Sequence, residues 1–132
     1  MSMDFYKHFS DVKKSDWHWL NFSPSEIASK REGELLVDFR SMDMLQELRY
    51  ALKKPIHLNS AYRSEAHNRA VGGSSNSFHM KGMAFDIDFA RGGYTRDELK
   101  DKAEEVGFRG VGDYNSFVHI DTRDRNAYWD ER

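Results

Sequence analysis

The spacing of apolar residues predicts several helices. From 41 to 54 the apolar residues recur at helical intervals, which indicates an amphipathic helix that ends before Pro55. A serine followed by Pro24 is typical of a helix start. A second serine cap predicts a short helix over 65–71, which two glycines terminate. A Thr-x-x-Glu capping box opens a helix over 95–106.

Alternation of apolar and polar residues predicts strands over 56–62, 84–89 and 117–121. Residues two apart on one strand share a face, so Asp86 and Asp88 should point together, as should His119 and Asp121. Helices and strands without a regular βαβ alternation favour the α+β class. Since no internal repeat or linker interrupts the pattern, residues 1–132 are expected to form a single domain.

Composition and charge narrow the possible functions. The chain is 39% hydrophobic, which is enough for a core. Its net charge of −2 provides no large positive electrostatic field that would attract the backbone of a nucleic acid. No stretch approaches the ~20 apolar residues of a membrane span, and the start of the chain lacks the pattern of a secretory signal. We therefore expect a soluble protein with neither nucleic acid nor membrane as partner, whose location the sequence leaves unknown.

Candidate chemistry lies on the polar faces of two predicted strands. With no cysteine in the chain, any metal must be held by nitrogen and oxygen ligands. Asp86 and His119 lie on such faces, and a bend at Gly82 could bring His79 alongside Asp86. Two histidines and one carboxylate are a known catalytic zinc set that leaves a fourth position for water. Spacing alone also allows ordinary polar roles for these residues.

A resemblance to a known family favours the zinc site. The segments that carry it are Ser60-Ala-Tyr-Arg-Ser, His67-Asn, Val71-Gly-Gly, Ser77-Phe-His-Met-Lys-Gly-Met-Ala-Phe-Asp86 and Phe117-Val-His-Ile-Asp121. They resemble the zinc D-Ala-D-Ala carboxypeptidase and murein endopeptidase family, which shares its metal site and fold with the hedgehog N-terminal domain. The likeness spans about 22–123 and is greatest to short, single-domain members of bacteriophage and bacterial genomes. It implies a small, mostly antiparallel sheet that carries the zinc site between flanking helices.

The resemblance also assigns roles to single residues. It implies that His79, Asp86 and His119 hold zinc, and that Arg63 binds the carbonyl or carboxylate region of the substrate. Ser77 would brace the site through a hydrogen bond.

The general base is less evident from the resemblance. Many members carry a glutamate or histidine shortly before the last ligand, where this chain has Ser116 and Phe117. Asp113 is the preferred general base, because the hedgehog domain has an acidic residue near that position. Asp121 is the second choice and Asp88 a weaker one.

The implied function is zinc-dependent hydrolysis of amide bonds in peptidoglycan stem peptides, either at a terminal D-Ala or at a cross-link. Endolysin-like access to the wall, through lysis, a holin or a phage particle, and a monomeric state are further expectations. Two alternatives remain open. One is a zinc-stabilised, hedgehog-like binding module without turnover, which the missing base favours; the other is a fold without metal.

Overall fold

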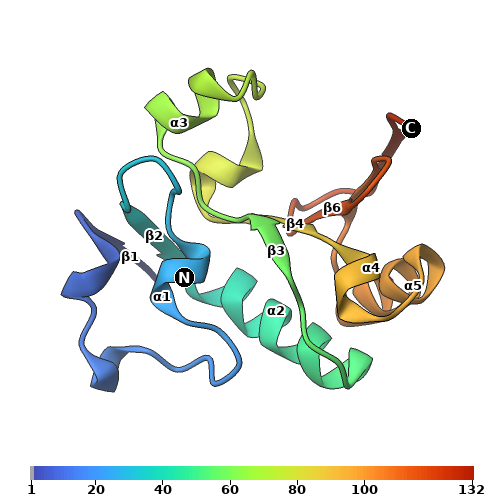
Figure 1. The fold of residues 1–132 in the computed structure, drawn as a ribbon, viewed down its shortest axis with the longest axis horizontal. Coiled ribbons are helices and arrows are strands. Elements are labelled where there is room, and N and C mark those ends of the chain that lie inside the picture. The colour runs from blue at the N-terminus through green and yellow to red at the C-terminus, as the bar shows by residue number, and fades with distance from the viewer. Residues whose placement is uncertain (1) are drawn as a thin grey trace.

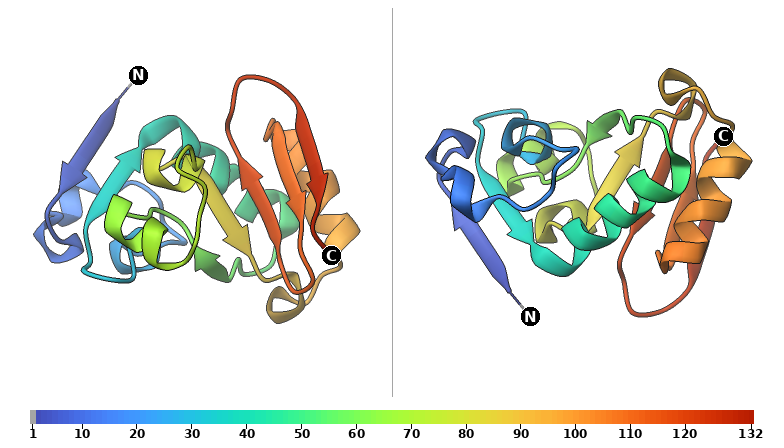
Figure 2. Two further views of the ribbon diagram at one scale, coloured as in Figure 1. Left: turned by 90° about the horizontal axis from the view of Figure 1, so that it is seen from above. Right: turned by 90° about the horizontal axis from the view of Figure 1, so that it is seen from below.

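A five-stranded sheet lies at the centre of the fold (Figure 1). The computed structural model describes residues 2–132. Its strands are β1 (Met3–Tyr6), β2 (Leu35–Asp38), β3 (Leu58–Ser60), β4 (Ala84–Ile87), β5 (Gly110–Asp113), β6 (Val118–Asp121) and β7 (Ala127–Asp130). The order in the large sheet is β3-β4-β6-β5-β7, and all neighbours are antiparallel except β5 and β7. Strands β1 and β2 form a separate antiparallel pair, from which β1 projects beyond the rest of the molecule (Figure 2).

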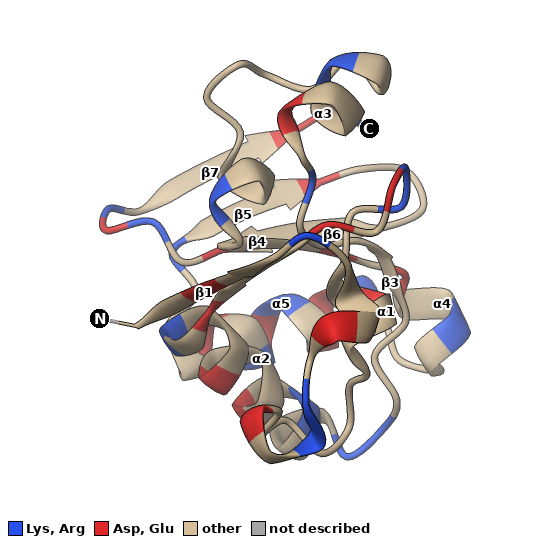
Figure 3. Cartoon of the chain, turned by 90° about the vertical axis from the view of Figure 1, so that its left-hand side faces the viewer, with Lys and Arg blue, Asp and Glu red and all other residues tan. Residues whose placement is uncertain are grey.

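The helices are α1 (Pro24–Ile27), α2 (Phe39–Leu52), α3 (Glu65–Ala70), α4 (Phe89–Gly92) and α5 (Arg96–Val106), with 3-10 turns η1 (Phe9–Asp11), η2 (Lys14–Asp16) and η3 (Phe78–Lys81). Figure 3 shows α3 on the opposite side of the large sheet from the other helices. This arrangement confirms the predicted α+β class with a mostly antiparallel sheet flanked by helices. Among residues 2–132, no helix combines the length and the apolar character needed to cross a membrane.

Capping residues fix where the two long helices begin. Asp38 accepts a hydrogen bond from the Ser41 backbone and starts α2, two residues before the predicted helix. Thr95 forms the expected capping box with Glu98 at the start of α5. The apolar stripes of both helices are buried in one core with the sheet, and each leucine buried there contributes roughly 1.5–3 kcal/mol.

The register between β4 and β6 sorts polar from apolar residues. Asp86 pairs with His119, whereas Phe85 pairs with Ile120 in the core. Directly opposed residues in an antiparallel pair lie on the same face, so both polar side chains point away from α5. The strand ends at Ile87, earlier than predicted.

Two local features of the strands differ from the predicted pattern. Asp88 caps α4 by accepting from the Arg91 backbone at 3.1 Å, so it does not share the face of Asp86. Strand β3 is shorter than predicted and contains an irregularity between Leu58 and Ser60, which places Ser60 opposite Asp86. Regular alternation would have kept Leu58 and Ser60 on one face.

Strand β5 was not predicted, because glycine is depleted in strands. Its glycines are nevertheless required where they lie. A side chain at Gly110 would collide with the Asp121 carboxylate, and one at Gly112 would collide with the Trp129 indole. Gly112 pairs with His119 in the ladder, so β5 leaves room on the polar face of the sheet.

Asp113 lies on the opposite face from His119, which corrects the prediction that it is the general base. It pairs with Val118, a core residue, and its side chain is fully buried. The carboxylate accepts from Arg96 at 3.1 Å, from Lys100 Nζ at 2.7 Å and from the Tyr128 hydroxyl. Asp113 therefore anchors α5 and β7 to the sheet and does not reach the metal ligands.

Replacing Asp113 by asparagine should destabilise the fold. The Arg96 and Lys100 cations would lose a buried partner, so the free energy of unfolding in urea at pH 7 should fall by about 2–3 kcal/mol. Asp101→Asn, on the exposed surface of α5, is the matched control. Equal urea midpoints for Asp113→Asn and the wild type would contradict the anchoring role.

The same comparison should depend on pH. Burial would raise the pKa of Asp113, but hydrogen bonds from Lys100, Tyr128 and Arg96 outweigh burial and lower the pKa below its usual 3.8. A lowered pKa in the folded state means that the stabilisation is present above pH 3.8 and lost as the pH falls through the folded pKa. The difference between the wild type and Asp113→Asn should therefore be constant near neutrality and shrink below pH 3.8.

Candidate metal centre

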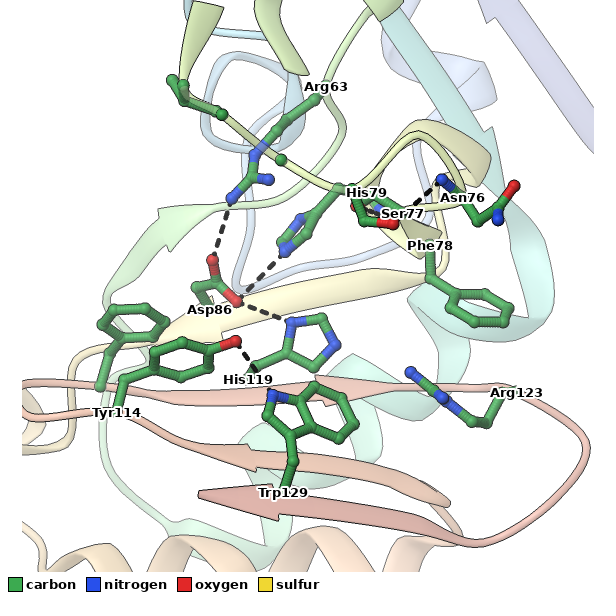
Figure 4. A pocket seen from close by; sticks show the side chains of 15 residues that line it. Arg63, Asn76, Ser77, Phe78, His79, Asp86, Tyr114, His119, Arg123 and Trp129 are labelled. Carbon is green, nitrogen blue, oxygen red and sulfur yellow. Dashed lines mark hydrogen bonds and ion pairs between the residues drawn. The ribbon is translucent and has the colours of Figure 1, made fainter. Parts of the chain in front are cut away.

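Two histidines and one aspartate from three elements meet on the polar face of the sheet (Figure 4). His79 comes from η3, Asp86 from β4 and His119 from β6. One ligand atom from each lies within 4.8 Å of the other two, and all three residues are buried. The structure thus brings together the three residues that the sequence singled out.

The η3 turn delivers His79 to the site. The Ser77 hydroxyl accepts from the His79 backbone N–H at 3.2 Å and caps the turn, which is a hydrogen bond of the bracing kind expected of Ser77. Gly82 ends the turn with φ +70°, a conformation that favours glycine. The ring itself is fixed by a 2.6 Å contact between Nδ1 and the Ala61 carbonyl oxygen. A short 3-10 helix therefore replaces the predicted hairpin-like path.

Asp121 holds the second histidine. Its Oδ2 lies 2.7 Å from His119 Nε2, and both of its oxygens also accept from the Arg123 guanidinium. Burial would raise the pKa of Asp121, but the hydrogen bonds from Arg123 and His119 outweigh it and lower the pKa to about 2. Asp121 is therefore ionised at neutral pH and acts as a fixed acceptor for His119.

The proton positions around the site suit a cation. A histidine that ligates a cation uses one unprotonated nitrogen and keeps its hydrogen on the other, and His79 Nδ1 and His119 Nε2 would keep theirs, because they face the Ala61 carbonyl and the Asp121 carboxylate. The other nitrogens, His79 Nε2 and His119 Nδ1, lie 3.1 and 3.0 Å from Asp86 Oδ1, so a cation would replace the protons that they can share with that oxygen. Three acceptors that face one another in a buried site are stabilised by a bound cation. The residues present therefore fit a metal ion.

Asp86 is prepared for this role by its surroundings. Burial would raise the pKa of its carboxyl, but hydrogen bonds with His119 and His79 hold it well below the usual range. Its second oxygen, Oδ2, accepts from Arg63 at 3.3 Å, which leaves Oδ1 toward the histidines. Asp86 is thus an anionic ligand with one oxygen available.

Arg63 lies beside the ligands and is held on three sides. Besides Asp86, it donates to the Ser60 hydroxyl at 3.0 Å and to the Asn68 side-chain oxygen at 3.3 Å. A side chain at Gly73 would collide with Asn68 and crowd Arg63, so glycine is needed there. A guanidinium has five N–H donors, so Arg63 keeps donors for a ligand in the adjoining cavity.

A cavity of about 550 Å³ opens over the three ligands. Its walls include Arg63, the loop over 71–77, and an aromatic side formed by Phe78, Tyr114, Phe117 and Trp129. Of the described residues, Asp86 is the one carboxylate that lines it. The site is therefore an open, partly cationic pocket with a metal-binding group at its base.

The candidates for general base do not reach this cavity. Asp121 is fully buried and both of its oxygens are engaged by His119 and Arg123, so its role is to orient His119, which corrects the expectation that it could take a proton from water. Asp88 caps α4 and Asp113 faces α5, as described above. Among the lining residues, the side chains that can donate a hydrogen bond to a substrate include Arg63, Tyr114 and Arg123.

Sequence reasoning missed several of the lining residues. One of them is Arg123, which binds Asp121 and packs over the rings of Phe78 and Trp129, with centroid distances of 4.6 and 5.0 Å. Tyr114 and Trp129 were not singled out. The pattern Gly110-x-Gly112 before Tyr114 was the available signal, since glycines two apart on a strand make one face accessible.

Comparisons with known proteins agree with this geometry. The model of the peptidase M15 family matches residues 20–121. A zinc D-Ala-D-Ala carboxypeptidase from Streptomyces albus G is 36% identical over 86 residues, which are 61% of this chain and 33% of that protein. The matched region thus spans a third of the length of this relative. The resemblance inferred from the sequence is confirmed.

Replacing Asp121 by asparagine should weaken metal binding. An amide in place of the carboxylate no longer selects the tautomer of His119 that presents Nδ1, so the affinity for Zn²⁺ should fall by about 10–100-fold. Competition with a chromogenic chelator measures that affinity. Asp124→Asn, an exposed aspartate three residues later, is the control and should bind Zn²⁺ like the wild type. Unchanged affinity in Asp121→Asn would exclude the orienting role.

Proposed function

Because this chain belongs to the peptidase M15 family, we propose that it is a zinc-dependent peptidase that hydrolyses amide bonds in peptidoglycan stem peptides. The observation that carries the proposal is the convergence of three acceptor ligands at the base of an open cavity. A purely structural metal site would be closed by a fourth protein ligand, whereas a catalytic site keeps one position free. Here His79, Asp86 and His119 are the three ligands that the described residues offer.

Zinc is the ion that this ligand set favours. Two histidines and one carboxylate form a recurring catalytic zinc set, although the same donors would accept other divalent ions. When bound, zinc would supply Lewis acidity and an activated water at neutral pH. The name of the relative from Streptomyces albus G points to the same metal.

Arg63 is suited to binding the substrate. Its guanidinium is immobilised by Ser60, Asn68 and Asp86, so few rotamers are lost when a ligand binds. Donors held beside the ligands can receive the carbonyl oxygen of the scissile amide or the carboxylate of a terminal residue. Both groups occur in stem peptides that end in D-alanine.

The substrate class follows from the family and from the shape of the cavity. The relative is named for cleavage of D-Ala-D-Ala, and the cavity of about 550 Å³ can take a short peptide. We include both a D,D-carboxypeptidase and a murein endopeptidase in the proposal. An endolysin-like setting and a monomeric state both stay predictions.

One observation favours a second candidate function. The cavity wall has no carboxylate besides the ligand Asp86 among the described residues, so it lacks the acidic general base that the sequence analysis had looked for. A zinc-stabilised module that binds wall peptides without cleaving them would need no such base. A measurement of turnover distinguishes the peptidase from the binding module.

Digestion of purified peptidoglycan tests the proposal. Wild-type protein loaded with zinc should release D-alanine or cleave cross-links, as read by mass spectrometry of the products, and a chelator should abolish the reaction. His79→Ala should lose Zn²⁺ and all activity, because it removes one of the three ligands. His57→Ala, a histidine outside the ligand group, is the control. Zinc-loaded wild type that binds but never cleaves wall peptides would establish the binding module instead.

Replacing Arg63 by alanine should reduce kcat/KM by about 10²–10³-fold, since the oxyanion or carboxylate would lose its guanidinium partner. Zinc content, measured in parallel, distinguishes this loss from damage to Asp86. The control is Arg69→Ala on α3, whose exposed guanidinium pairs with Glu65. Full activity in Arg63→Ala would remove Arg63 from the substrate site.

A further inference from the structure

Tyr114 lines the cavity that also contains the metal ligands, and the contacts that hold its hydroxyl leave the proton free. Tyr114 follows β5, its backbone N–H donates to the Phe117 carbonyl at 3.1 Å, and the two rings stack at 4.6 Å with 6° between their planes. This stack fixes the direction of the hydroxyl. Figure 4 shows that oxygen turned toward Trp129 and the His119 side of the cavity.

The partner of the Tyr114 oxygen is a donor. Trp129 Nε1 lies 2.9 Å from it, and an indole nitrogen can only donate, so the phenol oxygen is the acceptor. Within residues 2–132, no protein group accepts the O–H of Tyr114 in return. The hydrogen bond received from Trp129 also polarises that O–H, which makes it a better donor.

Several features of the fold place Trp129 where its indole can donate to the Tyr114 oxygen. Trp129 pairs with Gly112 in the parallel ladder, and a side chain at Gly112 would collide with the indole, so glycine leaves the space that the ring occupies. The same ring packs beside His119, with centroids 5.1 Å apart, and under the Arg123 guanidinium. The position of the Tyr114 hydroxyl is therefore built into three adjacent strands.

We propose that Tyr114 is a catalytic residue, whose O–H donates a hydrogen bond to the scissile carbonyl oxygen as that oxygen gains negative charge. The inference rests on the proposed peptidase function. Arg63 and Tyr114 line the same cavity as the three ligands, and Figure 4 shows their side chains on different sides of the ligand group, so Tyr114 would supply a second donor from another wall of the cavity. The proton stays on Tyr114 throughout, and no bond of the protein forms or breaks. Trp129 is a positioning residue, because it acts through Tyr114.

Tyr114→Phe tests this role, since it keeps the stack on Phe117 and removes only the hydroxyl. With diacetyl-L-Lys-D-Ala-D-Ala and with purified cross-linked muropeptides as substrates, kcat should fall by about 10²-fold. KM should change less than about threefold, because the bond forms mainly in the transition state. Zinc content should equal that of the wild type. Tyr50→Phe, an exposed tyrosine on α2, is the matched control.

Trp129→Phe examines the positioning step. It should lower kcat in the wild-type background and have little further effect when combined with Tyr114→Phe, because both changes act on one hydroxyl. Additive losses in the double variant would show that Trp129 acts separately from Tyr114. An unchanged kcat in Tyr114→Phe overturns the proposal while leaving the peptidase function intact.

A measurement of inhibitor affinity tests the donor role of Tyr114 independently of turnover. A phosphinate analogue of D-Ala-D-Ala carries the tetrahedral, anionic oxygens that the donor is meant to bind. Tyr114→Phe should raise its Kd at least about tenfold over the wild type, whereas Tyr50→Phe should not. Absence of wild-type cleavage together with this loss of phosphinate affinity would refute the peptidase function and keep Tyr114 as an anion-binding donor. Equal affinity in Tyr114→Phe, or no binding by the wild type, overturns the proposal.

Discussion

Three acceptor atoms that face one another at the polar side of a sheet are the constraint on which this structure depends. Asp86 Oδ1 lies within hydrogen-bonding distance of a nitrogen from each of His79 and His119, and the other nitrogen of each histidine faces another acceptor. Without a cation, hydrogen bonds from the histidines can hold these atoms together; a bound cation would replace the shared protons and make the three atoms a ligand set. The Ala61 carbonyl and Asp121 matter because they decide which nitrogen of each ring stays unprotonated.

Glycines on β5 leave space on the polar face of the sheet for this group of side chains. Gly110 and Gly112 on β5 lie opposite Asp121 and His119, and the space they leave is taken by the Asp121 carboxylate and the Trp129 indole. On the other face the same strand carries Asp113, which ties α5 to the sheet. The four residues of β5 thus have two roles: the glycines leave space on the face of the site, and Asp113 binds α5 on the other face.

The cavity next to the ligands is lined by hydrogen-bond donors. Arg63, fixed by its contacts with Ser60 and Asn68, and Tyr114, fixed by Phe117 and Trp129, both line the cavity above the ligands. Donors held in place before the substrate binds are the arrangement that stabilises developing negative charge. In the proposed peptidase, these donors would let a site without a second carboxylate in its wall act on a carbonyl group.

The sequence by itself determined most of the local elements and the three candidate ligands. Helical periodicity located α2, a capping box located α5, and alternation placed Asp86 and His119 on polar faces. The tertiary structure decided what the other charged residues do. Asp113 and Asp121 are both aspartates on strands near His119, yet one faces α5 and the other orients a ligand. Their roles depend on strand pairing and on partners distant in the chain, which local spacing does not encode.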